Sequence, residues 1–184
     1  MEIIGFDHDD LADGSGKAPY TFATKHLMAD THIINAATSD YDDFYRGTDM
    51  HDFLETTVYS ILPSELKSFI KAASKLFTTN SYGSSENMHA SAKLWLLSTA
   101  EIGYEEYNYR PVGEGVRYAR FTGDSSRIKK LANGTGAASK WWTRTPYAMN
   151  MWADYWRVNE DGADIIQAHG SVTDSLGVCF GFCV

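Results

Sequence analysis

Residues 141–146, WWTRTP, and residues 177–184, GVCFGFCV, are the most informative stretches of this chain. The first stretch opens on two tryptophans and closes on a proline. We predict a strand that Pro146 ends or places at a sheet edge. In the second stretch, one alternating set of residues is Val178, Phe180, Phe182 and Val184, and the other is Cys179, Gly181 and Cys183. Both sets are apolar or small, which predicts a central strand with both faces buried.

Tryptophan is concentrated around the first of these stretches, because four of the five tryptophans fall within residues 141–156. We expect Trp141, Trp142 and Trp156 to pack the β-rich half, and Arg144 to pair with a carboxylate across it. Further along, Asp161 and Gly162 stand between two apolar runs, 155–158 and 165–166. Asp-Gly in that position is a strong hairpin signal.

The sequence upstream predicts helices and then more strand. Apolar residues recur at three- and four-residue spacing over 50–62, and again from Ser64 to about Lys75, which predicts two helices in tandem. Residues 81–90 are rich in Ser, Asn and Gly and predict a loop. Residues 93–97 predict a short buried strand, and Ser98 with Glu101 has the spacing of a capping box.

These elements predict one α+β domain over residues 1–184. We expect a helical part at about 48–77 and a β-rich part at about 93–184. The helical pair should pack on a small, mostly antiparallel sheet. At 184 residues the chain is long enough for one such core.

The net charge of −8 argues against a nucleic-acid partner, which normally needs a basic surface. No apolar run approaches the roughly 20 residues of a membrane span, so we expect no membrane insertion. The N-terminus has neither the basic region nor the long apolar region of a signal peptide. Export by the standard route is therefore unsupported, although a virion protein needs no signal.

The two cysteines, Cys179 and Cys183, stand four residues apart. In a strand they lie about 13 Å apart on one face. That separation is too large for a disulfide, whose Cα atoms lie within about 7 Å. It is also too large for joint ligation of one metal. We interpret both as small buried apolar residues.

Several segments together carry a family resemblance: 4–9, 50–54, 94–98, 114–118, 141–146, the Val158 to Gly162 hairpin, and 177–184. In this order they resemble an uncharacterised domain family of gut-dwelling Gram-positive bacteria and their phages. The resemblance implies a C-type-lectin-like C-terminal half, a fold shared with phage tropism determinants and formylglycine-generating enzymes. Many relatives end in Gly-Val-Arg-Pro-Ala-Phe, whereas this chain has neither the arginine nor the proline.

Catalytic and metal-binding patterns are weak. Asp7, Asp9, Asp10 and Asp13 lie close together, but position twelve counted from Asp7 is Ala18 rather than the glutamate of a calcium loop. We interpret this segment as a solvated acidic loop, or as an aspartate capping a turn. The six histidines have no metal-ligand spacing. We expect no catalytic residue, no metal and no cofactor.

The most promising ligand site is the segment between the two predicted strands, where a scaffold would present a loop. Its candidate ligand-binding residues are Tyr147, Asn150, Trp152, Asp154 and Tyr155. Exposed Tyr147, Trp152 and Tyr155 would form a flat platform for a sugar ring or a protein partner.

We therefore expect a non-enzymatic phage virion protein, structural or receptor-binding, in a tail, baseplate or capsid surface. Its partners would be other virion proteins or a host-surface receptor or glycan, and it would form a homo-oligomer. Two alternatives stay open. One is a bacterial surface adhesin module that binds glycans, and the other is an oxidase related to formylglycine-generating enzymes.

Overall fold

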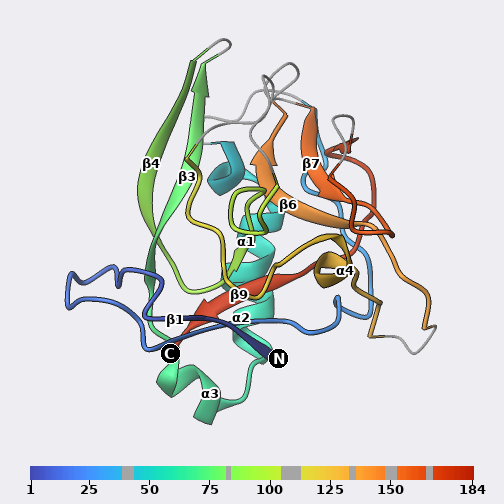
Figure 1. Ribbon diagram of the computed structural model, residues 1–184. Coiled ribbons are helices and arrows are strands. Elements are labelled where there is room, and N and C mark those ends of the chain that lie inside the picture. Colours follow the sequence, from blue (N-terminus) through green and yellow to red (C-terminus); the bar gives the residue numbers. More distant parts are fainter. Residues whose placement is uncertain (39–43, 82–83, 105–112, 133–135, 148–152, 165–167) are drawn as a thin grey trace.

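The final strand, β9 (Phe180–Cys183), lies inside a four-stranded antiparallel sheet (Figure 1). The computed structural model describes residues 1–38, 44–81, 84–104, 113–132, 136–147, 153–164 and 168–184. The strand order is β1 (Glu2–Phe6), β2 (Tyr20–Ala23), β9 and β5 (Trp95–Leu96). All four residues of β9 are buried. The predictions of a central strand at the C-terminus and of a buried strand around 95–96 are confirmed.

The tryptophan pair begins a second sheet of three antiparallel strands. Its order is β6 (Trp141–Pro146), β7 (Asp154–Val158) and β8 (His169–Ser171). All six residues of β6 are buried, which confirms the predicted packing of both tryptophans. The Asp-Gly turn is also present, because Gly162 N donates to Asn159 O at 3.0 Å. The expected partner strand at 165–166 lies outside the described residues, and β8 is the strand that pairs with β7.

The two most informative stretches of the sequence contact each other. Trp142 N donates to Gly177 O at 3.0 Å, and Gly177 N donates to Lys140 O at 2.9 Å. Arg144 N donates to Leu97 O, just beyond β5. Backbone hydrogen bonds therefore join the tryptophan strand both to the chain leading into β9 and to the chain leaving β5. This junction fixes the second sheet against the first.

The first predicted helix is confirmed, although its middle is wound more loosely than an α-helix. A 3₁₀ turn, η1 (Phe44–Gly47), precedes α1 (Asp49–Asp52), the π-helical η2 (Phe53–Val58) and α2 (Tyr59–Ile61). Thr48 caps the first turn by accepting a hydrogen bond from His51 N. Met50, Leu54 and Val58 are buried at four-residue spacing, so one face packs on the core.

The second predicted helix is wrong beyond Phe69. Helix α3 (Ser64–Phe69) buries none of its residues, and the expected helical pair packed on the sheet is not confirmed. From Ala73 the chain is extended, because Lys71 N donates to Cys183 O at 3.0 Å and Ala73 pairs with Ala92. Tertiary pairing here overrides the helical periodicity on which the prediction rested.

The loop predicted at residues 81–90 is wrong for its described part, because Ser81 belongs to one strand and residues 84–90 belong to the next. Strand β3 (Ala73–Ser81) pairs with β4 (Ser84–Ala92) along its whole length, and the hairpin extends along one side of the molecule (Figure 1). Ala73, Lys75 and Phe77 are buried, while Met88 is exposed. After the helices, strand structure thus resumes at Ala73 rather than at about 93. The polar composition concealed this ribbon, since a strand exposed on one face needs few apolar residues.

The remaining described helix is α4 (Asp124–Arg127), which lies against the second sheet through Arg127 O and the indole nitrogen of Trp141 at 3.0 Å. No helix within the described part of the chain is long and apolar enough to cross a membrane. The architecture is a small α+β fold with mostly antiparallel sheets and few helices.

The close approach at Gly177 generates a prediction. A Cβ at this position would lie 2.9 Å from Lys140 O and would also meet the Leu27 side chain. Because both neighbours belong to the core junction, we expect Gly177→Ala to lower the free energy of unfolding by about 1–3 kcal/mol. Urea unfolding measures this change.

Gly123→Ala is the matched control, because nothing lies within 4 Å of a Cβ built there. Its φ of 170° is extended backbone that alanine adopts freely. We expect a change within about 0.5 kcal/mol. Equal effects of the two substitutions would contradict the structural role of Gly177.

Candidate functional site

Five charged side chains lie buried where the three sheets meet. They are Asp9 in the loop after β1, Lys75 on β3, Glu101 in the turn after β5, Glu114 ahead of Tyr118, and Arg144 on β6. Each is 6% exposed or less. An isolated buried charge is costly, so each needs partners of opposite charge and hydrogen bonds.

The Lys75 ammonium is fully occupied by protein acceptors. It lies 2.5 Å from Asp9 Oδ1, forms an ion pair with Glu101, and donates to the Tyr118 hydroxyl at 3.1 Å. It also lies 4.8 Å from the centre of the Trp95 ring. An ammonium has three N–H donors, and each has an acceptor here. Lys75 is therefore held as an ion pair and keeps no donor for a ligand.

Arg144 connects all three sheets through its guanidinium. Its two terminal nitrogens donate to the two carboxylate oxygens of Glu101 at 2.6 and 3.1 Å. It also donates to Leu76 O on β3 and to Leu96 O on β5, while Nε lies 3.6 Å from Glu114 Oε1. Bidentate pairing of arginine with a carboxylate is strong and directional. The expectation that Arg144 pairs with a carboxylate across the β half is confirmed.

The same network shifts the pKa values of its acids in opposite directions. Burial raises the pKa of Asp9, but the Lys75 charge and hydrogen bonds from Lys75, Thr21 and Tyr118 outweigh it, so the pKa is lowered. Burial likewise opposes ionisation of Glu101, and the charges of Arg144 and Lys75 leave its pKa lowered. For Glu114, burial raises the pKa by more than the Arg144 charge and the hydrogen bond from Thr145 lower it, so the pKa is raised.

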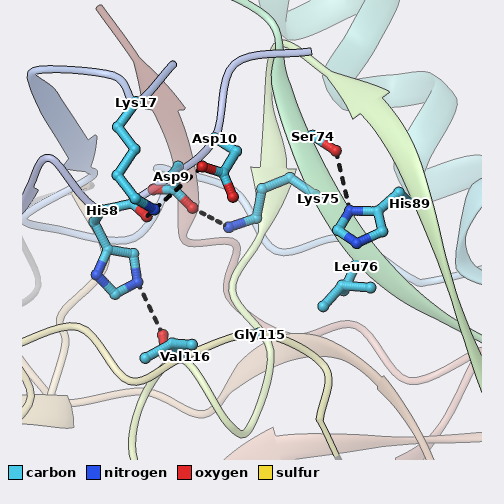
Figure 2. A pocket seen from close by; sticks show the side chains of 10 residues that line it. All are labelled: His8, Asp9, Asp10, Lys17, Ser74, Lys75, Leu76, His89, Gly115 and Val116. Carbon is cyan, nitrogen blue, oxygen red and sulfur yellow. Dashed lines mark hydrogen bonds and ion pairs between the residues drawn. The ribbon is translucent and has the colours of Figure 1, made fainter. Parts of the chain in front are cut away.

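A small hollow opens over the outer end of this network (Figure 2). Asp9 and Lys75 lie in it, and His8, Asp10, Lys17, Ser74 and His89 are among the residues that line it. Lys17 Nζ lies 3.2 Å from Asp10 Oδ1 and donates to His8 O at 2.9 Å. The hollow has a volume of about 130 Å³. Pockets for drug-sized ligands are larger, at roughly 300–1,000 Å³.

The two histidines of the hollow have protein partners of their own. His8 Nε2 lies 3.1 Å from Val116 O, and since a carbonyl only accepts, Nε2 carries the proton. His89 Nδ1 lies 3.0 Å from the Ser74 hydroxyl. Within the described ranges, no group of three or more His, Cys, Asp or Glu residues could hold a metal. The hollow therefore suits water or a small polar molecule better than a substrate with its cofactor.

The structure corrects one expectation about the acidic segment before residue 14. Asp9 is not solvated, because Lys75, Thr21 and Tyr118 surround its carboxylate. Asp13 fits the expectation, since it accepts a hydrogen bond from Ser15 N at 2.9 Å in an exposed turn. The spacing of the aspartates could not reveal which one turns inward.

Of the five predicted ligand-binding residues, the structure places only Tyr147 and Asp154 together at the surface. Asn150 and Trp152 lie outside the described residues. Tyr155 is 0% exposed, so the expectation of an exposed Tyr155 is wrong. As the second residue of β7 it faces the core, and its neighbours Asp154 and Tyr147 are partly exposed.

Tyr147 and Asp154 meet on His169, a residue that the sequence did not single out. The Tyr147 and His169 rings stack at 4.0 Å and 7°, and His169 Nδ1 lies 3.1 Å from Asp154 Oδ2. Trp156 packs edge-on against Tyr147 at 5.4 Å. Strand pairing of β7 with β8 produces this contact, since Trp156 lies opposite His169. We call these four residues the aromatic ledge.

Both cysteines are free and buried, as predicted. Burial, and the nearby charge of Asp9, raise the pKa of Cys183 to about 12. The Cys183 thiol lies 3.5 Å from the Thr21 hydroxyl. A reactive cysteine needs a lowered pKa and access to solvent. Cys183 has the opposite properties, which weighs against thiol chemistry.

Sequence reasoning singled out Arg144 as half of an ion pair and Glu101 as part of a capping box, but it did not predict the network that joins them to Lys75 and Asp9. The Ser98–Glu101 capping box is present, with Ser98 N donating to Glu101 Oε2 at 3.0 Å and Glu101 N donating to Ser98 Oγ at 3.1 Å. Nothing local indicates that the same carboxylate also binds Lys75 and Arg144. The alternation of Ala73, Lys75 and Phe77 is the one signal that could have placed Lys75 inward on a strand.

Residues 23–184 match a family described as a domain of unknown function, DUF6273. The chain belongs to this family. The matched range of DUF6273 includes Lys75, Glu101, Glu114 and Arg144, whereas Asp9 precedes it. Searches of curated proteins and of solved structures gave no match.

Removing the central cation should destabilise this DUF6273 protein strongly. Arg144→Met leaves Glu101 and Glu114 without their guanidinium partner in the interior. Breaking a buried pair in this way costs about 3–5 kcal/mol. Urea unfolding gives the value. Arg120→Gln is the control, because this partly exposed pair with Glu2 should contribute no more than about 1 kcal/mol. A loss below that figure for Arg144→Met would contradict the role assigned to it.

The opposite pKa shifts predict a specific pH dependence of stability. Native Asp9 and Glu101 have lowered pKa values, so their contribution is lost as the pH falls through the acid range. Native Glu114 binds its proton more tightly than the unfolded chain does. Its contribution is present below its ordinary pKa of 4.5 and is lost as the pH rises through the raised native value.

Glu114→Gln isolates the second effect, because the amide has a similar shape and does not titrate. We expect the variant to keep the acid limb and to lose the decline above about pH 4.5 that Glu114 causes in the parent. The measurement is the free energy of unfolding in urea from about pH 3 to about pH 8. Parallel curves for parent and variant would show that folding does not raise the pKa of Glu114.

Proposed function

We propose that this protein is a non-enzymatic binding or structural module. The observation that carries the proposal is the mutual saturation of Lys75, Arg144 and their carboxylates, which leaves these buried groups no free donor for a substrate. A catalytic lysine or acid has to reach the reacting atoms. Here the charged groups instead hold three sheets together.

The setting that we propose is the surface of a phage virion, in a tail, baseplate or capsid component. Its support is the sequence resemblance carried by residues 141–146 and 177–184. The same resemblance supports the proposal of a C-type-lectin-like C-terminal half. Partners would be other virion proteins or a host-surface receptor or glycan, in a homo-oligomeric assembly. Repeated copies raise the avidity of a weak site.

The aromatic ledge is the part of the described surface that best suits receptor contact. Asp154 holds His169 by a short polar contact, and the His169 ring in turn stacks on Tyr147. Trp156 supports Tyr147 from the buried side. Aromatic side chains fixed in this way offer contact area at low entropic cost. A sugar ring or a receptor loop could bind across Tyr147 and Asp154.

Tyr147→Ala should weaken binding to the receptor-bearing cell or glycan by about tenfold or more, the usual effect of removing an aromatic anchor. Binding to a glycan array and to bacterial cells measures it. Tyr20→Ala is the control, because Tyr20 is an exposed tyrosine on β2, in the four-stranded sheet and not in the sheet that carries the aromatic ledge. If the parent binds no cell, glycan or virion protein, the proposal fails.

The oxidase alternative is tested separately with cysteine-containing substrate peptides, which mass spectrometry follows for conversion to formylglycine. Under the present proposal neither the parent nor Cys183→Ser converts the peptide. Conversion by the parent and its loss in Cys183→Ser, with an unchanged unfolding curve, would establish an enzyme and refute the binding role as the sole function.

A further inference from the structure

A cationic hollow lies at the start of β1, away from the buried ion network. It has a volume of about 200 Å³, and among the residues that line it are Lys25, His26, Arg120, Lys129 and Lys130. Glu2 is the single carboxylate in its lining. The chain as a whole carries a net charge of −8, so this concentration of positive charge runs against its composition.

The backbone sets these side chains next to one another. Residues after β2 run parallel to residues after α4, with Leu27 opposite Leu131. Leu27 N donates to Lys130 O at 2.9 Å, and Ala132 N donates to Leu27 O at 3.1 Å. Lys25 and Lys130 therefore belong to two hydrogen-bonded segments that are more than 100 positions apart in the sequence. A sequence pattern alone could not bring them together.

One of the cations is structural. Lys129 is 3% exposed, and its ammonium donates to Glu2 Oε1 at 3.1 Å, to Thr24 O at 2.6 Å and to Lys25 O at 3.4 Å. These contacts use all three of its donors. Lys129 thus fixes the wall of the hollow, and its charge is balanced by the Glu2 carboxylate.

The positive charges of Lys25 and Lys130 are not neutralised in this way by a carboxylate in the segments that the structure describes. Glu2 also accepts from Arg120 Nε at 2.9 Å, and although burial opposes ionisation, Lys129 and Arg120 keep its pKa lowered. It therefore stays ionised but neutralises only one positive charge. No carboxylate of the described residues forms an ion pair with Lys25 or Lys130, and both side chains are exposed.

We propose that this hollow binds a phosphate or sulfate group of an anionic polymer. Ammonium groups and the terminal nitrogens of an arginine are the donors that such oxyanions prefer. A hollow of 200 Å³ accommodates one such group with a few waters, each of which occupies roughly 30 Å³. It is too small for a whole oligomer, so the rest of the ligand lies outside it.

A second hollow indicates where the uncharged part of the ligand lies. It has a volume of about 370 Å³, shares Arg120 with the first, and is lined by Ile3, Ile4 and Phe6 of β1. Phe6 is 68% exposed and Ile3 is 39% exposed. The carbon backbone of a repeating phosphodiester, or a sugar face, packs here while its charged group enters the cationic hollow. This site does not depend on the virion setting.

The experiment compares poly(glycerol phosphate) and heparin as probes, with inorganic phosphate as competitor. Binding to the purified protein is measured by calorimetry at low salt. The test variant is Lys25→Gln with Lys130→Gln. The control variant is Lys71→Gln with Lys93→Gln, which removes the same charge from exposed lysines that line neither hollow.

We expect one of the two polymers to bind, with affinity about tenfold or more weaker in the test variant and unchanged in the control. Added salt and inorganic phosphate should compete, because the contact is electrostatic. Tighter binding of poly(glycerol phosphate) identifies a phosphodiester ligand, and tighter binding of heparin a sulfated one. The proposal is overturned if neither polymer binds, or if both double variants weaken binding equally.

Discussion

Arg144 is the residue on which the arrangement of the three sheets depends. It lies on β6, donates to backbone carbonyls on β3 and β5, and grips both carboxylate oxygens of Glu101. Glu101 binds Lys75, which binds Asp9 in turn. Ion pairs and hydrogen bonds thus connect residues of all three sheets in one continuous network. Because no member can be left unpaired in the interior, the sheets can meet only in an arrangement that satisfies all of them.

This constraint does not make the network a large net source of stability. Desolvation of buried charges offsets much of their mutual attraction, and well-packed apolar residues can replace such groups at little cost. What the network contributes here is specificity of packing, a role attested in some proteins and inferred for this one. The surrounding core is aromatic, with Trp95 and Tyr118 contacting Lys75. An incorrect packing of these large side chains would leave Arg144 or Lys75 uncompensated.

The buried network also differs in its charge pairing from the surface that we propose as a binding site. Inside, each cation has a carboxylate, whereas at the start of β1 Lys25 and Lys130 have none among the described residues. The network reaches beyond the DUF6273 match as well. Asp9 and Thr21 lie ahead of residue 23, yet they complete the surroundings of Lys75, which lies within the match. The segment before the matched range is therefore part of the core.

Strands with a strong local pattern could be predicted from the amino-acid sequence. One strand was predicted from the tryptophan pair and Pro146 in residues 141–146, the other from the alternation through 180–183, and the structure places both as predicted. The same holds for the first helix and for the Ser98–Glu101 capping box, whose hydrogen bonds span only three residues. The pairing of Arg144 with a carboxylate was expected, but not which one. Three features became evident only in the folded chain: Asp9 turns inward, the chain is extended from Ala73, and Lys25 and Lys130 line the same hollow. Each of these depends on partners distant in the sequence, and no local periodicity records such partners.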